Sequence, residues 1–240
     1  MSRIPVEAVN MEGGSNKKTG DIISCRSALM TSDMHCKKGS KCPQLEAIAR
    51  TASRLGTECL VVAGDLFDDF HEEADAELFF KEFGKICSIE SLPAKTIIVL
   101  SGSSHDPILD KFIVKTTSGK TLFVTRQITP LYTSKGKVVV IHGDIIIRSG
   151  ALAFVINYLA KILGQNLFLE RKFREKIRLE SGWLVAGHTH IYGVDDKEKI
   201  VNLGSWKKHW FKNLPYWRRS KPVVLVIGEK GLKLHVVDYL

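Results

Sequence analysis

Short apolar runs, mostly without strict alternation of apolar and polar residues, recur along most of the chain. Such runs are typical of strands that are buried on both faces of a sheet. They lie at 22–30, 59–63, 96–100, 121–124, 137–141, 183–186, 200–201, 223–227 and 232–237. Helical patterns separate several of the early runs, and the last runs follow one another as a strand meander. This order predicts an α/β layered domain with a central mixed sheet system.

Four segments have apolar residues spaced for one face of a helix: 43–55, 74–86, 150–164 and 167–179. The apolar stretch 151–164 is too short to cross a bilayer and is predicted to be a core helix packed on the sheet. The first 20 residues are polar and contain glycine, which predicts a flexible or loosely packed lead-in. Residues 21–240 are predicted to form a single domain.

The chain carries a net charge of +9, which favours a polyanionic partner or substrate. Segment 206–221 holds six Lys or Arg residues, no acidic residue and three of the four tryptophans. Basic residues interleaved with aromatic ones suit an anionic membrane surface, which they would contact peripherally, and they suit single-stranded nucleic acid equally well. A solvated hairpin whose aromatic side chains cover the sheet is the third interpretation, and the sequence leaves all three open.

The five cysteines include no CxxC pair, so a structural zinc site is not expected. The N-terminal residues contain no apolar stretch of the signal-peptide type, and we expect a cytoplasmic protein, with peripheral membrane attachment as an extension of that prediction. Reduced thiols are expected in that compartment. A disulfide between Cys36 and Cys42 is the alternative.

Residues able to bind metal ions follow five of the apolar runs. They are Asp33 and His35, Asp65, His105, His142, and His188 and His190. In open α/β sheets, ligands bind beyond the carboxyl ends of the strands, so we expect these side chains to meet in one crevice. Asp68 and Asp69 follow in the loop after Asp65 and are expected to stabilise the N-terminus of a helix.

The residue types suit a pair of metal ions. Imidazole and carboxylate together bind Mn²⁺, Fe or Zn²⁺ better than Mg²⁺ or Ca²⁺. Two ions about 3.5–4 Å apart can clamp a phosphoryl group and activate a hydroxide. Asp65 is the candidate for a carboxylate that touches both ions. We therefore predict two divalent ions, with Mn²⁺ as the first choice and Fe, Ni or Zn as alternatives.

These strings resemble, in their order, the calcineurin-like metallophosphoesterase family. The family pattern D-x-H, G-D-x-x, G-N-H-[DE], H and G-H-x-H corresponds here to five blocks. They read Asp33-Met34-His35, Gly64-Asp65-Leu66-Phe67, Gly102-Ser103-Ser104-His105-Asp106, His142-Gly143 and Gly187-His188-Thr189-His190. The resemblance covers about residues 27–206 and implies a four-layer αββα sandwich.

By position, the resemblance implies a role for each site residue. Asp33, His35 and His190 would hold the first metal, Asp65 would bridge, and His142 and His188 would hold the second. His105 would contact the phosphate and protonate the leaving group as a catalytic residue. Ser104 stands where the family has an asparagine ligand of the second metal, so it is the expected ligand and substrate contact there. A serine hydroxyl is a poorer ligand than an amide oxygen, which predicts a weaker second site.

The implied activity is that of a hydrolase, in which a metal-activated hydroxide attacks a phosphoester or pyrophosphate bond. A phosphate-containing substrate, either nucleotide or lipid-linked, is the expected partner, and a phosphodiesterase is the expected subclass. Two alternatives remain: a nuclease of the same family, and a phosphate-binding module whose catalysis is weakened by Ser104.

Overall fold

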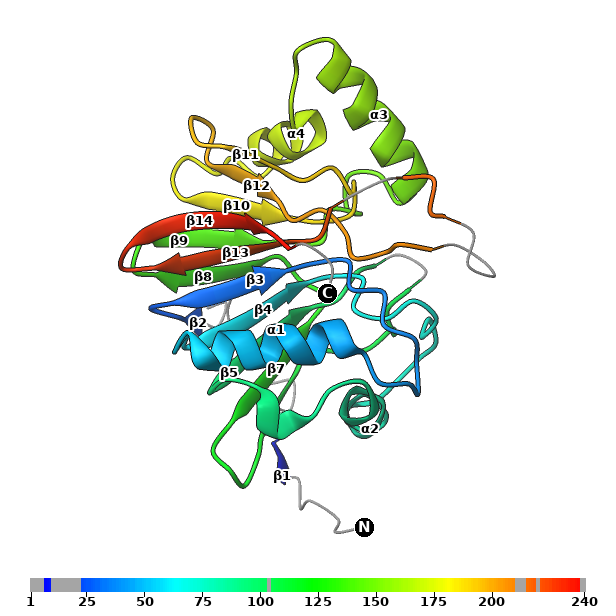
Figure 1. The fold of residues 1–240 in the computed structure, drawn as a ribbon, viewed down its shortest axis with the longest axis vertical. Coiled ribbons are helices and arrows are strands. Elements are labelled where there is room, and N and C mark those ends of the chain that lie inside the picture. The colour runs from blue at the N-terminus through cyan, green and yellow to red at the C-terminus, as the bar shows by residue number, and fades with distance from the viewer. Residues whose placement is uncertain (1–6, 10–22, 103–104, 210–214, 219–220, 238–240) are drawn as a thin grey trace, which may run out of the picture.

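Two β-sheets stack face to face, and helices cover the outer side of each sheet (Figure 1). The computed structural model describes residues 7–9, 23–102, 105–209, 215–218 and 221–237. Helix, sheet, sheet and helix follow one another as layers, which confirms the predicted four-layer α/β sandwich.

The larger sheet has eight strands. They are β1 (Glu7–Val9), β3 (Ala28–Thr31), β4 (Cys59–Ala63), β5 (Lys95–Val99), β6 (Phe112–Lys115), β7 (Thr121–Thr125), β13 (Val223–Gly228) and β14 (Gly231–Val236). Their order across the sheet is β1-β6-β7-β5-β4-β3-β13-β14. The central strands β3, β4, β5 and β7 are parallel neighbours, so their carboxyl ends all lie at one edge of the sheet.

The smaller sheet has six strands. They are β2 (Ile23–Ser24), β8 (Thr129–Thr133), β9 (Gly136–Val140), β10 (Trp183–Ala186), β11 (Gly193–Asp195) and β12 (Ile200–Asn202). Their order is β11-β12-β10-β9-β8-β2, and β10 is parallel to both β9 and β12. The carboxyl ends of β9 and β10 therefore also lie at one edge.

Four α-helices and one 3-10 helix are described. They are α1 (Pro43–Arg54), α2 (Ala76–Ile86), η1 (Ile89–Ser91), α3 (Gly150–Ile162) and α4 (Phe168–Lys176). Local signals explain three of the starts. Pro43 stands at the first position of α1, where its missing N–H costs nothing. Asp75 and Ser149 cap α2 and α3 by accepting hydrogen bonds from the N–H groups of Leu78 and Leu152.

Strand residues alternate between the inner and outer faces of their sheets. Met30 and Val138 point into the apolar core between the sheets, whereas their neighbours Leu29 and Val139 point outward. Leu29 contributes to the core under α1 and α2, and Val139 contributes to the core under α4. Both faces are buried, which is why these runs are continuously apolar.

Helix α3 contradicts the prediction of a core helix packed on the sheet. Only Ala153 and Asn157 of its residues are buried, and no α3 residue other than Ala153 is among the buried hydrophobic residues. The apolar sequence suggested burial. Helix α4, however, packs on β10 and β12 and covers this side of the smaller sheet, so α3 lies outside it (Figure 1). No helix in the described part of the chain is long and apolar enough to cross a bilayer.

Four short strands were not predicted from the sequence: β1, β6, β8 and β11. Strand β1 lies inside the predicted lead-in and pairs with β6, while the rest of residues 1–20 lies outside the described part of the chain. Strand β11 lies at a sheet edge, and both β11 and β8 have few apolar residues, so their apolar pattern is weak; β6 is an apolar run of only three residues.

The expectation of reduced thiols is wrong for four of the five cysteines. The structure joins Cys25 to Cys59 and Cys36 to Cys42, the second of which is the alternative considered from the sequence. The first pair follows from the neighbouring positions of β3 and β4, which only the fold reveals. Cys87 is a free, buried thiol, and burial raises its pKa to about 11.

The core under α2 generates a stability prediction. Phe79 is fully buried, and its ring lies 5.5 Å from that of Phe112 and 6.0 Å from that of Phe67. Phe79→Ala should lower the free energy of unfolding by about 3–5 kcal/mol, because it leaves a cavity between rigid strands and a helix. Urea denaturation followed by circular dichroism measures this.

Leu55→Ala is the matched control, because Leu55 is an apolar residue that is 58% exposed at the end of α1. Its effect should stay within about 0.5 kcal/mol. Equal losses in the two variants would contradict this description of the core.

Candidate metal centre

The carboxyl ends of strands from both sheets meet at one side of the molecule. The predicted site residues that follow these ends are Asp33 and His35 after β3, Asp65 after β4, His105 after β5, His142 after β9, and His188 and His190 after β10. Ligand atoms from the two sheets lie within 4.8 Å of one another in three overlapping groups. The crevice expected from the sequence therefore exists, and its members come from both sheets.

Backbone hydrogen bonds fix the first two loops against each other. The Asp33 N–H donates to the Gly64 carbonyl at 2.9 Å, and the His35 N–H donates to the Asp65 carbonyl at the same distance. The loop after β10 is tied to them, because the His188 N–H donates to the Asp33 carboxylate at 3.0 Å. Hydrogen bonds thus hold three separate stretches of chain in fixed positions around the site.

Strained backbone concentrates at the same residues. In the described part of the chain, eight residues other than glycine have a positive φ angle, and five of them are predicted metal ligands. These five are Asp33, His35, Asp65, His188 and His190. Such conformations are rare for residues with a Cβ and cluster at functional sites, where the surrounding structure enforces them.

Asp33, His35 and His190 form the first group of ligand atoms. The Nε2 atom of His190 lies 3.1 Å from Asp33 Oδ1. Burial lowers the pKa of His190 to about 4, so its imidazole is neutral and able to bind a metal near neutral pH.

His35 provides the test of whether a metal ion fits. Its Nδ1 lies 3.0 Å from Asp68 Oδ1, so the carboxylate holds the proton on Nδ1 and leaves the lone pair on Nε2. That Nε2 is buried and has no hydrogen-bond partner in the described part of the chain. It points toward Asp65, whose Oδ2 is 3.8 Å away. A buried acceptor without a donor beside two carboxylates is what a cation would complete.

Asp65 and His142 join the two sheets in a second group with Asp33. His142 Nε2 lies 3.4 Å from Asp65 Oδ1, and its Nδ1 is 3.1 Å from the Ala63 carbonyl, to which it donates. Gly64 permits this approach, because a Cβ there would overlap the His142 ring, and its φ of 83° also favours glycine.

His188 is brought to the site but lies outside the three groups of ligand atoms. Its Nδ1 lies 3.1 Å from His142 Nε2, and its Nε2 lies 2.7 Å from the Ile147 carbonyl. The carbonyl accepts the proton of Nε2, so Nδ1 of the neutral ring carries a lone pair that faces the lone pair of His142 Nε2. Ligation through His188 Nδ1 would replace this contact with a contact to the metal.

His105 lies at the more open side of the cluster, in the third group with His35 and Asp65. Its ring packs edge-on against that of His35 at 4.9 Å, and its Nδ1 donates to the Asp68 carbonyl at 2.8 Å. Its Nε2 forms no hydrogen bond with the described residues, which leaves this atom available to a substrate. Ser104 lies outside the described residues, so its role as ligand and substrate contact stays a prediction.

Two further residues support the ligands through contacts that the sequence did not specify. Asp68 was expected at a helix N-terminus, but it binds His35 and Lys207 instead, and these two partners hold the pKa of its partly exposed carboxyl well below the usual range. Asp106 is fully buried and accepts hydrogen bonds from the N–H groups of Phe67 and Ser101, each at 2.9 Å. It joins the loops after β4 and β5.

Glu170 holds the His188-Thr189-His190 loop from behind. Its buried carboxylate accepts hydrogen bonds from Thr189 Oγ1 at 3.0 Å, Asn202 Nδ2 at 2.7 Å and Asn157 Nδ2 at 2.8 Å. In the sequence, Glu170 is seen only as an acidic residue within a basic helix. No sequence pattern connects it to Thr189.

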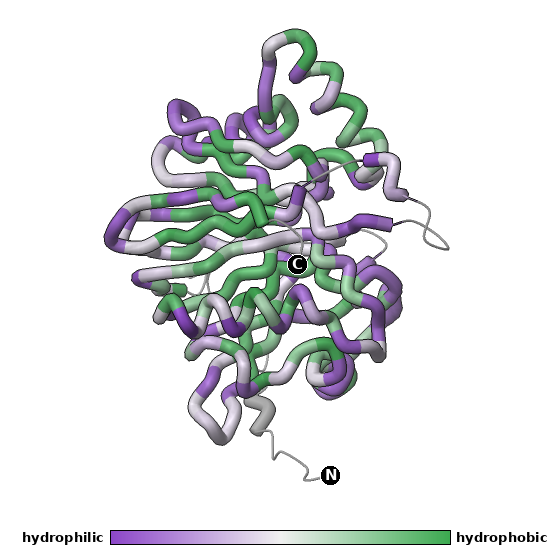
Figure 2. Tube along the Cα trace, viewed as in Figure 1, coloured by the Kyte–Doolittle hydropathy of each residue, from purple (hydrophilic) through white to green (hydrophobic). Residues whose placement is uncertain are grey.

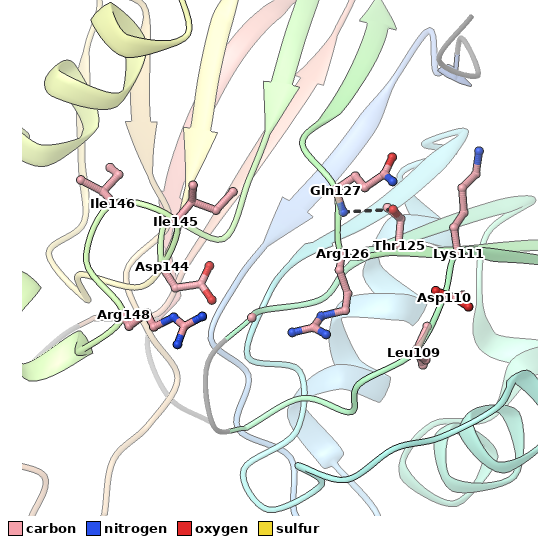
Figure 3. Close-up of a pocket in the computed structure, with 11 residues that line it drawn as sticks. Leu109, Asp110, Lys111, Thr125, Arg126, Gln127, Asp144, Ile145, Ile146 and Arg148 are labelled. Carbon is pink, nitrogen blue, oxygen red and sulfur yellow. Dashed lines mark hydrogen bonds between the residues drawn. The ribbon is translucent and has the colours of Figure 1, made fainter. Parts of the chain in front are cut away.

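A pocket of about 600 Å³ lies against the loop that follows His142 and Gly143 (Figure 3). Asp144, two residues after His142, points into it together with Arg126 and Arg148 (Figure 3). Neither arginine forms a hydrogen bond or ion pair with the described residues. Gly102 keeps the space open, since a Cβ there would lie 3.0 Å from Asp144 Oδ2 and 3.5 Å from a guanidinium nitrogen of Arg126. The pocket offers two unpaired cations to an anionic ligand.

Segment 206–221 is described in part. Trp206 is buried and its Nε1 donates to Thr31 Oγ1 at 2.8 Å, as expected for an aromatic residue that covers the sheet. Trp217, in contrast, is 47% exposed. Trp210 lies outside the described residues, so neither partner predicted for this segment is tested.

Solved structures offer only distant likenesses. Vps29 of Entamoeba histolytica complexed with Zn²⁺ is 13% identical, with a TM-score of 0.45 over 88% of this chain and 98% of that one. A predicted phosphoesterase from Streptococcus pneumoniae is 14% identical, with a TM-score of 0.38 over 88% of this chain and 87% of that one. Vacuolar protein sorting 29 of Cryptosporidium parvum is 11% identical, with a TM-score of 0.41 over 90% and 98%.

No family model matches the chain. No curated protein matches it either.

The Glu170 contacts generate a prediction about metal affinity. Glu170→Gln should weaken Mn²⁺ binding by about 10–100-fold, because an amide NH₂ would face a donor and release the loop that carries His188 and His190. Isothermal titration calorimetry measures the affinity. Glu175→Gln, on the same helix, is the control, since Glu175 has a side chain that is 64% exposed and pairs with Lys172. An unchanged affinity in Glu170→Gln would show that this carboxylate does not position the loop.

Proposed function

We propose that the protein binds divalent metal ions at this centre and hydrolyses a phosphoester or pyrophosphate bond with them. The observation that carries the proposal is the buried, unpartnered Nε2 of His35 beside the carboxylates of Asp33 and Asp65. The resemblance of the five ordered motifs to calcineurin-like metallophosphoesterases points the same way.

In this proposal Asp33, His35 and His190 hold one ion. Asp65 has one oxygen near His35 and the other near His142, and it would hold both ions, the second of them together with His142. Ser104 and His188 are the remaining predicted ligands of that second ion. Mn²⁺ is the ion of first choice for this mixture of imidazole and carboxylate, with Fe, Ni and Zn as alternatives.

When bound, such ions lower the pKa of water and offset negative charge on a phosphoryl group. The residues of the chain supply the rest. His105, which is partly exposed and donates to the Asp68 carbonyl, would contact the phosphate and give a proton to the leaving oxygen. Arg126 and Arg148 offer a cationic surface to further anionic groups of the substrate, in keeping with a nucleotide or another phosphate-containing compound.

A second function is favoured by the position of His188. Because His188 lies outside the three groups of ligand atoms, the second ion lacks one expected ligand in this arrangement. The corresponding candidate is a phosphate-binding module that holds one ion and has little or no activity.

Mn²⁺ stoichiometry and turnover distinguish the two functions. Two bound ions per chain with hydrolysis of bis-p-nitrophenyl phosphate support the enzyme. One bound ion and no turnover with Mn²⁺, Ni²⁺ or Fe²⁺ support the binding module. Nuclease activity, the other alternative from the sequence, is checked in the same assay with a labelled oligonucleotide.

Replacing the bridge gives the sharpest prediction for the enzyme. Asp65→Asn should reduce turnover of bis-p-nitrophenyl phosphate to background and lower the metal content at both positions, since one substitution removes a ligand from each ion. Metal content is measured by mass spectrometry of the purified protein. Asp69→Asn is the control, because Asp69 is exposed and contacts only the Lys38 N–H among its described partners. Near-normal turnover in Asp65→Asn would contradict the assignment of Asp65 as the ligand shared by both ions.

A further inference from the structure

Helix α3 exposes an apolar surface that the proposed chemistry does not use. The surface consists of Leu152 at 52% exposure, Val155 at 39%, Tyr158 at 51%, Leu159 at 54%, Ile162 at 66% and the adjoining Leu163 at 78%. We call these six residues the α3 face. Figure 2 shows the helix as a largely hydrophobic element that projects from the body of the molecule. Scattered exposed apolar residues are ordinary, but a contiguous set on one helix indicates an interaction surface.

The helix is fixed with this face outward. On its inner side Asn157 is buried, donates to Glu170 at 2.8 Å and accepts from the Leu169 N–H at 2.9 Å. Rotating α3 to bury the apolar face would break both hydrogen bonds. The buried carboxylate of Glu170 would then lose one of its donors. The exposure of the α3 face is therefore a property of the packed structure.

The stretch of chain that carries the α3 face has charges of one sign. Residues 145–169 contain no acidic residue but include Arg148 and Lys161. Trp217 packs edge-on against Phe154 of α3 at 5.4 Å, and the basic segment 206–221 thereby reaches the helix. An anionic lipid surface attracts basic residues beside an apolar face, whereas a protein partner does not require them.

We propose that the α3 face inserts into the interface of an anionic lipid bilayer, with Lys161 beside it contacting lipid phosphates. A helix of 13 residues is about 20 Å long, too short to span a bilayer, so it would lie in the plane of the interface. Trp217, an aromatic residue exposed at its side, is of the type enriched at that level. The inference does not depend on the metal chemistry.

Vesicle flotation tests the inference with the full chain. The protein should float with vesicles made from equal parts of phosphatidylglycerol and phosphatidylcholine, and much less with phosphatidylcholine alone. Added salt should weaken the binding, because the attraction to anionic lipid is screened. Failure of the protein to float with the anionic vesicles would overturn the proposal.

Two variants, one double and one single, connect the binding to the helix. Leu159→Ser combined with Ile162→Ser should lower the vesicle partition coefficient by about tenfold or more for each side chain, since each loses its apolar burial in the bilayer. Lys161→Gln should lower it about fivefold, and only for anionic vesicles. Leu159, Ile162 and Lys161 are all exposed, so neither variant should change the melting temperature. An unchanged melting temperature confirms that the variants fold.

Leu55→Ser is the matched control, because Leu55 is 58% exposed but lies on α1, away from α3. It should bind vesicles like the unsubstituted protein. Equal flotation of the α3 double variant would overturn the proposal. So would a dimer in size-exclusion chromatography that the double variant abolishes, because a second copy of the chain would then cover the α3 face.

Discussion

The contact between the two sheets is the constraint on which the rest of the molecule depends. Apolar side chains from both sheets, such as Met30, Val61, Val140 and Val185, are fully buried between them. Such an interface excludes the metal-binding side chains, which are confined to the loops where the strands end. Because β3, β4 and β5 are parallel in one sheet and β9 and β10 in the other, stacking the sheets brings loops from both together. The candidate centre is a consequence of that stacking.

The loops at the centre contain strained backbone, which the stacked sheets below them hold in place. Five site residues adopt left-handed backbone conformations, which cost about 1–3 kcal/mol each. The hydrogen bonds between the loops after β3 and β4, and from the His188 N–H to Asp33, keep these residues in place. The stable sandwich below thus supports a loop arrangement that the loops alone would not adopt, with imidazoles and carboxylates crowded together.

A single buried carboxylate connects this centre to the surface of α3. Glu170 binds Thr189, which stands between two predicted ligands, and it also binds Asn157, which fixes α3 with its apolar face outward. Burial raises the pKa of Glu170, and its three neutral donors compensate for the lost contact with water. The orientation of the metal loop and the orientation of α3 are therefore set by the same side chain.

The sequence by itself determined the layered α/β class, most strands, all four α-helices and the residues that meet at the strand ends. These features are local, because continuous apolar runs, helical spacing and motif order are read over short stretches. Only the tertiary structure decided the contacts between distant residues: Asp68 with His35, Glu170 with Thr189, Cys25 with Cys59, and the turn of His188 toward His142. It also decided that α3 is exposed, since burial depends on whether another element is present to cover a helix, and no pattern within that helix specifies this.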